Sequence, residues 1–527
     1  MVRGSNTNGV DTPPGTVLLS QVFTTRESST ILQPAPSDDP NEPLNWSKLR
    51  KGVNFTLALF YVLFTFVLLD IQFVAYAEYV EDVGMTTFVY TTSIALNYTG
   101  LAVGCVFFIP FTYRYGRRPV YLVSLALQLA CAIWSARVTT NGELMASNLV
   151  MGLAGAISET IVQVTIADLF FTHQYATVNG LFLGTQATGA YLGPVAAGYV
   201  IDSQGWRWMW WWCTIFLSVT FLLVLFFFEE TTYTPLIGSL PGNCEPEATM
   251  TGGGSNPKKD TAEEGLQPVA SISVPNLYPA RRPLRERFAL VTKTPAPISQ
   301  HFYRPFILLV MFPGMAYTAI TYGSLLAWFA IMNTLAPQHL SAPPYNFSAS
   351  ALGLFNVAPF IGSVVGMAIT PLNDWIILHL ARRNNGLYEP EMRLYPAIPG
   401  ALLTTGGIAM FGFGLCHNAP WPVVAVGLAI NGAGFMVCGD VAISYAIDSY
   451  KDAVGDGFVG VVFVRNVFSV VVLFSLVPWI KGMGLQNMFI LCVVLSLVLG
   501  TIPVFLIFWG KDARRFTADR YRHYVLH

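Results

Sequence analysis

Most of this sequence consists of long apolar stretches separated by short polar segments. An apolar stretch of about 20 residues is long enough to cross the hydrocarbon core of a membrane as a helix. Six such stretches can be placed in each half of the chain, which predicts an all-α integral membrane protein with 12 transmembrane helices in two six-helix bundles. The expected spans are roughly 53–76, 88–112, 119–137, 143–167, 178–201, 208–228, 303–333, 348–373, 394–416, 421–447, 457–480 and 486–509.

Charged residues are scarce, and this excludes most other classes of protein. They make up 11% of the 527 residues, against about 25% in a typical soluble domain, while 53% are apolar. A soluble enzyme of this size could not cover its surface, and neither disorder nor a coiled coil fits. The net charge of −1 gives no attraction for nucleic acid. The seven cysteines show no CxxC spacing, and we expect no metal site and no cofactor.

Two polar segments interrupt the apolar pattern. The first 47 residues are rich in Pro, Ser and Thr, and a segment near 231–302 is rich in Pro, Gly, Ser and charge. Such segments cannot bury a core, so we expect the tail and the first part of the linker to be disordered. The predicted parts are a cytosolic tail (1–47), an N-terminal bundle (48–230), a cytosolic linker (231–302), a C-terminal bundle (303–510) and a cytosolic tail (511–527).

The basic residues set the orientation. With both termini in the cytosol, only Arg137, Arg207 and Lys481 face the opposite side. Because basic loops stay in the cytosol, we expect this topology. It places the sequon that begins at Asn346 outside, where it can be glycosylated. We expect the plasma membrane, with a vacuolar or other internal membrane as the alternative.

The loop after the second span is short and basic. It reads YRYGRRP over residues 113–119. Such a turn lets two helices meet closely at the cytosolic face, and its arginines can bind helix ends and carboxylates. Alternatively, the arginines only determine topology. In the second half, Asp374 is followed by Arg382 and Arg383 in a comparable place.

Glycines recur through the fifth span, which reads GLFLGTQATGAYLGPVAAG over residues 180–198. Gly189, Gly193 and Gly198 are spaced so that backbones can approach closely, and Pro194 removes a helical hydrogen bond and bends the helix. Ordinary packing of small residues between membrane helices is the alternative.

These two motifs resemble the major facilitator superfamily. The loop resembles its pattern G-x-L-a-D-r-x-G-r-r, although Ile109 and Tyr113 stand at the Gly and Asp positions, and the Gly-Pro string resembles the helix 5 antiporter motif that separates exporters from other members. The resemblance implies a conformational motif at Arg114, Gly116, Arg117, Arg118, Asp374, Arg382 and Arg383, and an antiporter motif at Gly189, Gly193, Pro194 and Gly198.

Four short strings narrow the resemblance to one branch. They are DPNEPLNW before the first span, FFFEETTY closing the sixth, ARRNNGLYEPEMRL after the eighth and AIDSY after the tenth. Together they are similar to the fungal drug:proton antiporter-like branch with twelve helices. This implies a monomeric secondary transporter in the lipid bilayer that moves a small molecule in exchange for protons.

Ionisable residues inside the spans are candidates for proton coupling. Glu159 lies near mid-membrane in the fourth span, where a charge is costly unless it is neutral, paired or hydrated, so reversible protonation is feasible. The alternative is a structural, hydrogen-bonded Glu159. Asp70, Asp440 and Arg465 are the other candidates, and the last two could pair inside the C-terminal half. Asn148 stands where the superfamily has an arginine linked to proton transfer.

Aromatic residues of the seventh span are candidates for a substrate cavity. Tyr317, Tyr322 and Trp328 lie in a span that Pro313 and glycines interrupt, and broken helices often form transporter sites. Packing aromatics are the alternative. An aromatic cavity with one or two acids suits a hydrophobic or cationic organic molecule. We therefore expect a proton-coupled exporter of drugs, toxins or secondary metabolites, with a proton-coupled importer of a sugar or polyamine as the alternative. Motifs of enzymes such as HExxH and GxSxG are absent from the sequence.

Overall fold

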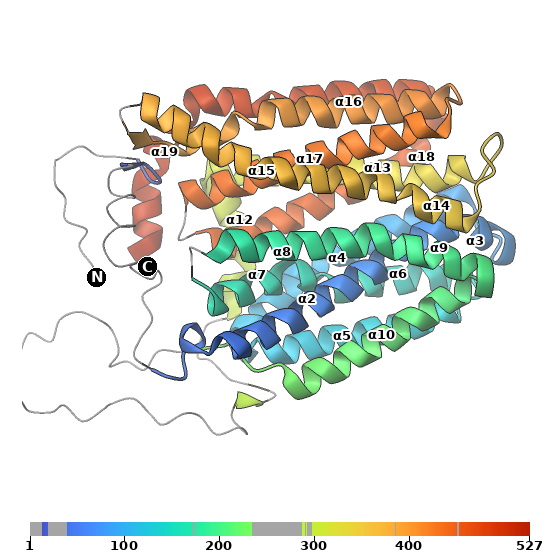
Figure 1. The fold of residues 1–527 in the computed structure, drawn as a ribbon, viewed down its shortest axis with the longest axis horizontal. Helices are drawn as coiled ribbons and strands as arrows, with labels where there is room; N and C mark the ends of the chain where they lie inside the picture. The colour runs from blue at the N-terminus through green and yellow to red at the C-terminus, as the bar shows by residue number, and fades with distance from the viewer. Residues whose placement is uncertain are drawn as a thin grey trace, which may run out of the picture.

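The computed structural model describes residues 13–18, 39–171, 174–233, 287–289, 291, 298–384, 386–450 and 453–526. These residues are mostly helical, and the helices run side by side along one axis (Figure 1). The N-terminal half, blue to green, forms one side of the bundle, and the C-terminal half, yellow to red, forms the other. The start of α2 (Lys48–Asp70) and the last turns of α19 (Ile502–Leu526) lie at the same end.

Several spans of the N-terminal half are built from more than one helical element. The half begins with the short 3-10 helix η1 (Pro43–Asn45). Its spans are α2 with η2 (Ile71–Ala75) and α3 (Tyr76–Asp82), α4 (Thr87–Tyr115), α5 (Arg117–Ala136), α6 (Asn141–Gly155) with α7 (Ile157–Leu169), α8 (Tyr175–Ala187) with η4 (Thr188–Leu192) and α9 (Gly193–Gln204), and α10 (Trp206–Phe227).

The C-terminal half repeats this plan. Its elements are α12 (Ile298–Met311) with α13 (Pro313–Leu340), α14 (Ala349–Phe355) with α15 (Val357–Arg383), η5 (Pro390–Leu394), α16 (Ala397–Cys416), α17 (Trp421–Ser449), α18 (Val454–Gly500) and α19. The long helix α18 contains two passes, because it turns back at Gly484, whose φ of 81° is in the left-handed region that favours glycine. After this turn, α18 packs against α16, where Ser496 bonds with Thr405.

The twelve expected spans are accounted for in the described residues. Ten helical ranges are long and apolar enough to cross a membrane, and the last of them, Gly457–Tyr524, contains both passes around Gly484. The segment formed by α8, η4 and α9 adds the remaining span over residues 175–204. The predicted fold of two six-helix bundles is confirmed.

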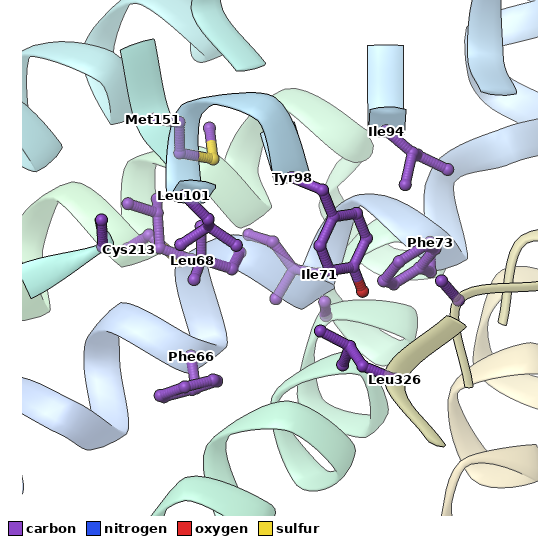
Figure 2. Packing of buried hydrophobic residues seen from close by; sticks show 14 of the residues in the cluster. Phe66, Leu68, Ile71, Phe73, Ile94, Tyr98, Leu101, Met151, Cys213 and Leu326 are labelled. Atoms are coloured by element: carbon purple, nitrogen blue, oxygen red, sulfur yellow. The ribbon is translucent and has the colours of Figure 1, made fainter. Parts of the chain in front are cut away.

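The packing places apolar residues both inside and outside. Figure 2 shows part of the main buried cluster, in which Ile71 and Phe73 of η2 lie beside Tyr98 of α4. The hydroxyl of Tyr98 is directed toward Leu326 of α13, so the cluster extends from one half into the other. Elsewhere, apolar residues face outward, as a surface in contact with lipid requires. On α10, for example, Val219, Leu222 and Phe226 are 51%, 50% and 64% exposed.

Two parts of the N-terminal tail, which was expected to be largely disordered, have defined structure. Residues 17–18 form strand β1, which pairs antiparallel with strand β2 (Leu387–Tyr388) between α15 and η5. Closer to α2, Asp39 is buried and accepts a hydrogen bond from the hydroxyl of Tyr233 at 3.0 Å. The rest of the tail and residues 234–286 of the linker lie outside the described residues.

Candidate functional site

A buried ion pair joins the two bundles at their centre. Glu159 lies in the first turn of α7, and its carboxylate pairs with the guanidinium of Arg465 on α18 in the opposite half. Each side chain is only 5% exposed. Asn466, the next residue of α18, donates from Nδ2 to Oε2 of Glu159 at 3.3 Å. Two side chains of the opposite bundle therefore hold Glu159.

This pairing differs from the one considered within the C-terminal half. Arg465 pairs with Glu159 and not with Asp440, which lies half-buried on α17. The guanidinium carbon of Arg465 also lies 4.9 Å from the ring centroid of Tyr322 on α13. Because α18 packs along α4 and α7, Arg465 faces the N-terminal half.

Asp70 is a second acid beside this pair. It is the last residue of α2, it is 9% exposed, and its carboxyl interacts electrostatically with Glu159. Tyr98 of α4 and Tyr191 of η4 also interact electrostatically with Asp70. Three of the four expected coupling residues, Asp70, Glu159 and Arg465, are thus brought together.

The helices of the N-terminal half are interrupted where they reach this centre. Directly after Asp70, α2 changes into the 3-10 helix η2, and α6 gives way to α7 three residues before Glu159. The fifth span contains η4, a π-helical turn of five residues. Such turns are rare and frequently mark functional sites. The interruptions place acidic and aromatic side chains at the centre, as in other transporter sites.

The first two motif glycines of the fifth span face α2. A Cβ at Gly189 would lie 2.6 Å from the carbonyl oxygen of Leu63, and one at Gly193 would lie 3.1 Å from Cγ2 of Val67. The contact at Gly189 leaves no room for a side chain, and a side chain at Gly193 would require Val67 to shift. These glycines therefore allow the fifth span to pack tightly on the first within the N-terminal half.

The last motif glycine faces the opposite half. A Cβ at Gly198 would lie 2.4 Å from the carbonyl oxygen of Ala349 on α14. Reciprocally, a Cβ at Gly353 would lie 2.7 Å from the carbonyl oxygen of Pro194. The expected antiporter motif thus brings the two halves into backbone contact at the end away from the loop 113–119.

The loop 113–119 is held by an acid that follows the sixth span. Gly116 has a φ of 99°, and a Cβ there would lie 2.5 Å from Oε2 of Glu230. The carboxylate of Glu230 accepts hydrogen bonds from the backbone N–H groups of Arg117 and Arg118 at 2.9 and 3.0 Å. The Arg117 side chain pairs with Asp168 at the end of α7, with 3.0 Å between Nε and Oδ2.

Arg114 and Tyr113, at the start of this loop, have different surroundings. Arg114 is exposed, and its guanidinium carbon lies 6.0 Å from the ring centroid of Tyr115. Tyr113, which stands where an aspartate was expected, stacks on His301 of α12 with 4.4 Å between ring centroids. Tyr113 therefore contacts the opposite half through its ring.

The expected second copy of the loop motif is arranged differently. Arg382 and Arg383 are exposed at the end of α15, and Asp374 lies within α15 with a side chain outside the described residues. The counterpart of the Arg117 pair is instead formed by Arg393 of η5 and Asp448 at the end of α17. The site residues expected from the sequence did not include Arg393.

The three aromatic candidates of the seventh span do not share one cavity. Tyr317 and Trp328 line a small cavity inside the C-terminal half, between α13, α16, α17 and the twelfth span. Tyr322 is not among its lining residues and instead lies beside Arg465. Polar residues of the same cavity are Thr321, Ser324, Thr404, Cys438 and Ser496.

Asn148, which stands where a coupling arginine was expected, is held by hydrogen bonds to residues of α4. It is 1% exposed, and its Nδ2 donates to the hydroxyl of Ser93 at 2.6 Å. Its carbonyl oxygen accepts from Nδ2 of Asn97 at 3.3 Å. Asn148 therefore connects α6 to α4 inside the N-terminal half.

Three residues of the centre were missed from the sequence. Asn466 directly follows Arg465, and its position as a second polar residue inside the eleventh span was a usable signal. No comparable signal marks Tyr98 or Tyr191, because aromatic residues are common in membrane spans. Among the described residues, no cluster of His, Cys, Asp and Glu is arranged to hold a metal ion.

The chain is similar to a family profile and to several known proteins. The family profile described as Major Facilitator Superfamily matches residues 55–471. An uncharacterized MFS-type transporter of Schizosaccharomyces pombe is 28% identical, with 97% of this chain and 94% of that protein covered. Protein HOL1 of Saccharomyces cerevisiae is 27% identical, with 94% and 92% covered. Efflux pump radE of Floropilus chiversii is 24% identical, with 90% and 83% covered.

The fold is also similar to that of a solved structure. The crystal structure of a POT family transporter in complex with 5-aminolevulinic acid matches with a TM-score of 0.59 over 86% of this chain and 95% of that chain. The sequence identity is 12%, so the similarity concerns the fold alone.

Proposed function

The chain belongs to the major facilitator superfamily, and from this premise we propose that it exports small organic molecules by proton antiport. It is a multi-pass membrane transporter and not an enzyme. In the proposed mechanism, the two bundles rock about the central acids and open the site to one side of the membrane at a time.

The pair between Glu159 and Arg465 carries the proposal. Loss of one partner of a buried ion pair costs about 3–5 kcal/mol. Protonation of Glu159 removes its negative charge, so it weakens a contact that spans the two halves at their centre. A proton can therefore bias the equilibrium between the two open states, which is the requirement for coupling.

Three observations support export of a hydrophobic or cationic molecule. Gly198 and Pro194 of the motif that resembles the antiporter motif lie at the contact between the halves. A relative that is 24% identical is named an efflux pump. The centre combines two acids with Tyr98, Tyr191 and other aromatic rings, which suits such a substrate.

The test is proton-driven transport by the purified protein in liposomes, measured over a panel of organic cations and neutral hydrophobic compounds. We expect Glu159→Gln to abolish flux driven by a pH gradient, with at least a hundredfold loss, because Gln cannot release a proton. Exchange of labelled for unlabelled substrate without a gradient should persist. Full gradient-driven flux in Glu159→Gln would contradict the coupling role.

A matched control is Glu81→Gln, which changes an exposed acid of α3 in the same half. It should transport like the wild type. The direction of the proton gradient that drives accumulation then decides between export and import. If the substrate accumulates in the same direction as the protons flow, the protein is an importer and not the proposed exporter.

We further propose a plasma-membrane location, with Asn346 glycosylated on the outer face. Asn346 is exposed in the turn before α14 and has a φ of 46°. Asn346→Gln should lower the apparent mass of the protein from a eukaryotic host by one glycan. An unchanged mass would exclude glycosylation at this position.

A further inference from the structure

Part of the N-terminal tail binds the opposite half from the span that it precedes. Strand β1, residues 17–18, pairs antiparallel with β2 of the C-terminal half, beside the last turns of α19 (Figure 1). The residues just before the strand make further contacts there, whereas Asp39, closer to α2, bonds with Tyr233 of the N-terminal half. Residues 13–18 are therefore a separate segment with a binding place of its own.

Four residues of this segment form a turn whose shape follows from their sequence. The residues are Pro13, Pro14, Gly15 and Thr16, and the N–H of Thr16 donates to the carbonyl oxygen of Pro13 at 3.3 Å. Proline as the second residue and glycine as the third are typical of a type II turn, and Gly15 has the positive φ, 84°, that this turn requires. Because the prolines already restrict the unbound chain, little conformational freedom is lost on binding.

The turn lies against two elements of the C-terminal half. A Cβ at Gly15 would lie 2.4 Å from the carbonyl oxygen of Asp448, at the end of α17, and 3.0 Å from Cγ of Pro390 in η5. The positive φ of Gly15 also disfavours any residue with a Cβ. The binding place therefore requires glycine at this point of the turn.

Arg514 of α19 connects the segment to a buried charge. Its guanidinium is 1% exposed and pairs with Glu391 of η5. From Nη1, Arg514 also donates to the carbonyl oxygen of Pro14, and to Oγ1 of Thr16 at 3.4 Å. A buried guanidinium with unused donors is costly, so the segment supplies acceptors that the ion pair alone does not. Binding of the segment should therefore stabilise the contact between α19 and η5.

Most of these contacts involve the backbone of the segment. Two of its residues add a strand to β2, and the carbonyl of Pro14 accepts from Arg514. Addition of a strand to a free edge is a common way in which proteins bind an extended peptide. Because the segment belongs to the same chain, its local concentration is high, and even weak contacts stay formed.

We propose that this end of the C-terminal half is a binding site for an extended peptide with a Pro-Gly turn, and that the protein's own residues 13–18 are its ligand. The site consists of β2, the start of η5, the end of α17 and Arg514. Its occupancy stabilises the C-terminal half. The inference goes beyond the proposed function and does not depend on the direction or coupling of transport.

The first test removes the ligand and returns it as a separate molecule. A variant without residues 2–18 should bind a fluorescent peptide of residues 11–20 in a saturable way, and this peptide should raise the Tm of the variant. The wild type should show no saturable binding, because its own segment fills the site. A peptide with Gly15→Val should have an at least tenfold higher Kd, although it is more apolar and enters detergent more readily. Equal affinity for both peptides, or no binding, would overturn the proposal.

The second test uses the full chain, so it does not depend on folding of the shortened variant. Gly15→Val should lower the Tm and make hydrogen exchange of the amides of residues 387–394 at least threefold faster. Gly52→Val is the matched control, because no atom lies within 4 Å of a Cβ at that position, and it should leave the exchange unchanged. Wild-type exchange in Gly15→Val would contradict the proposal.

The mass of the purified protein decides which copy supplies the ligand. If the segment binds within its own chain, the wild type and the variant without residues 2–18 are both monomeric over the same range of concentration. A wild-type dimer that is lost when residues 2–18 are removed would mean that the segment binds a second copy. That result would overturn binding within one chain.

Discussion

At the end of the molecule that carries the loop 113–119, each half pairs an arginine near the start of its third span with an aspartate near the end of its fourth. Arg117 pairs with Asp168 in the N-terminal half, and Arg393 pairs with Asp448 in the C-terminal half. The residues that bind the loop before the third span have opposite charges in the two halves. The acid Glu230 follows the sixth span and accepts hydrogen bonds from the backbone N–H groups of Arg117 and Arg118, whereas bases follow the twelfth span, where Lys511 binds Glu389 and Arg514 binds Glu391.

The ionic contacts within each half allow it to move as one rigid body. In both halves, the chain that follows the last span returns to bind the loop before the third, and only the sign of the charge is exchanged. Of the salt bridges between described residues, only the pair of Glu159 and Arg465 joins the two halves. Within the described part of the chain, motion between the halves therefore needs to break one ion pair, while the ionic networks within each half can stay intact.

The largest effect is expected from breaking the ion pair between Glu159 and Arg465, which joins the two halves. Arg465→Ala leaves Glu159 buried without its cation, at a cost of about 3–5 kcal/mol. We expect a lower Tm and loss of transport to background. The double variant Glu159→Gln/Arg465→Ala should recover most of the Tm but none of the gradient-driven flux. If the Tm of the double variant were as low as that of Arg465→Ala, the unpaired charge of Glu159 would not be the cause of the instability.

The next effect tests whether the ionic networks of the two halves are equivalent. Arg514 is 1% exposed and holds Glu391 with two hydrogen bonds of 2.8 and 2.5 Å, whereas Asp168 also accepts from Thr231 at 3.1 Å. Arg514→Leu should therefore lower the Tm more than Arg117→Leu, because Asp168 keeps a hydrogen bond from Thr231 when its arginine is lost and Glu391 loses both of these hydrogen bonds.

The control on the same helix is Arg515→Leu. Arg515 pairs with Asp512 on the surface, and the two side chains are 56% and 70% exposed. Such pairs contribute about 0–1 kcal/mol, so the Tm should hardly change. Equal losses for Arg514→Leu and Arg117→Leu would remove the asymmetry between the halves.

The smallest effect is expected at the opposite end, where backbone contacts take the place of charges. Gly198→Val puts a side chain against the carbonyl oxygen of Ala349, so it should separate the outer ends of the halves. We expect about a tenfold slower transport cycle and faster labelling of a cysteine introduced at Ser350 from outside. Gly180→Val, at a glycine with open space around it, should label at the original rate. If this cysteine is labelled at the original rate in the Gly198→Val variant, the contact between Gly198 and Ala349 does not help to close this end of the protein.

Much of the fold followed from local sequence patterns. The apolar stretches predicted the spans, although the first span runs on through η2 and α3 to Asp82 and the seventh begins earlier, at Ile298 in α12. The glycines of the fifth span were recognised because close packing needs small residues wherever the helix lies. Strand β1 was not predicted, since it exists only by pairing with residues about 370 positions away in the chain.

The sequence alone determined which residues belong in the membrane and which buried ionisable groups were candidates, because the cost of burying charge depends on residue type and span. Only the tertiary structure decided their partners. Glu159 and Arg465 are 306 positions apart, on different bundles, and Asp440 lies closer to Arg465 in the sequence. Which acid meets a base depends on how two separately folded bundles dock, and periodicity within one span carries no information about that contact.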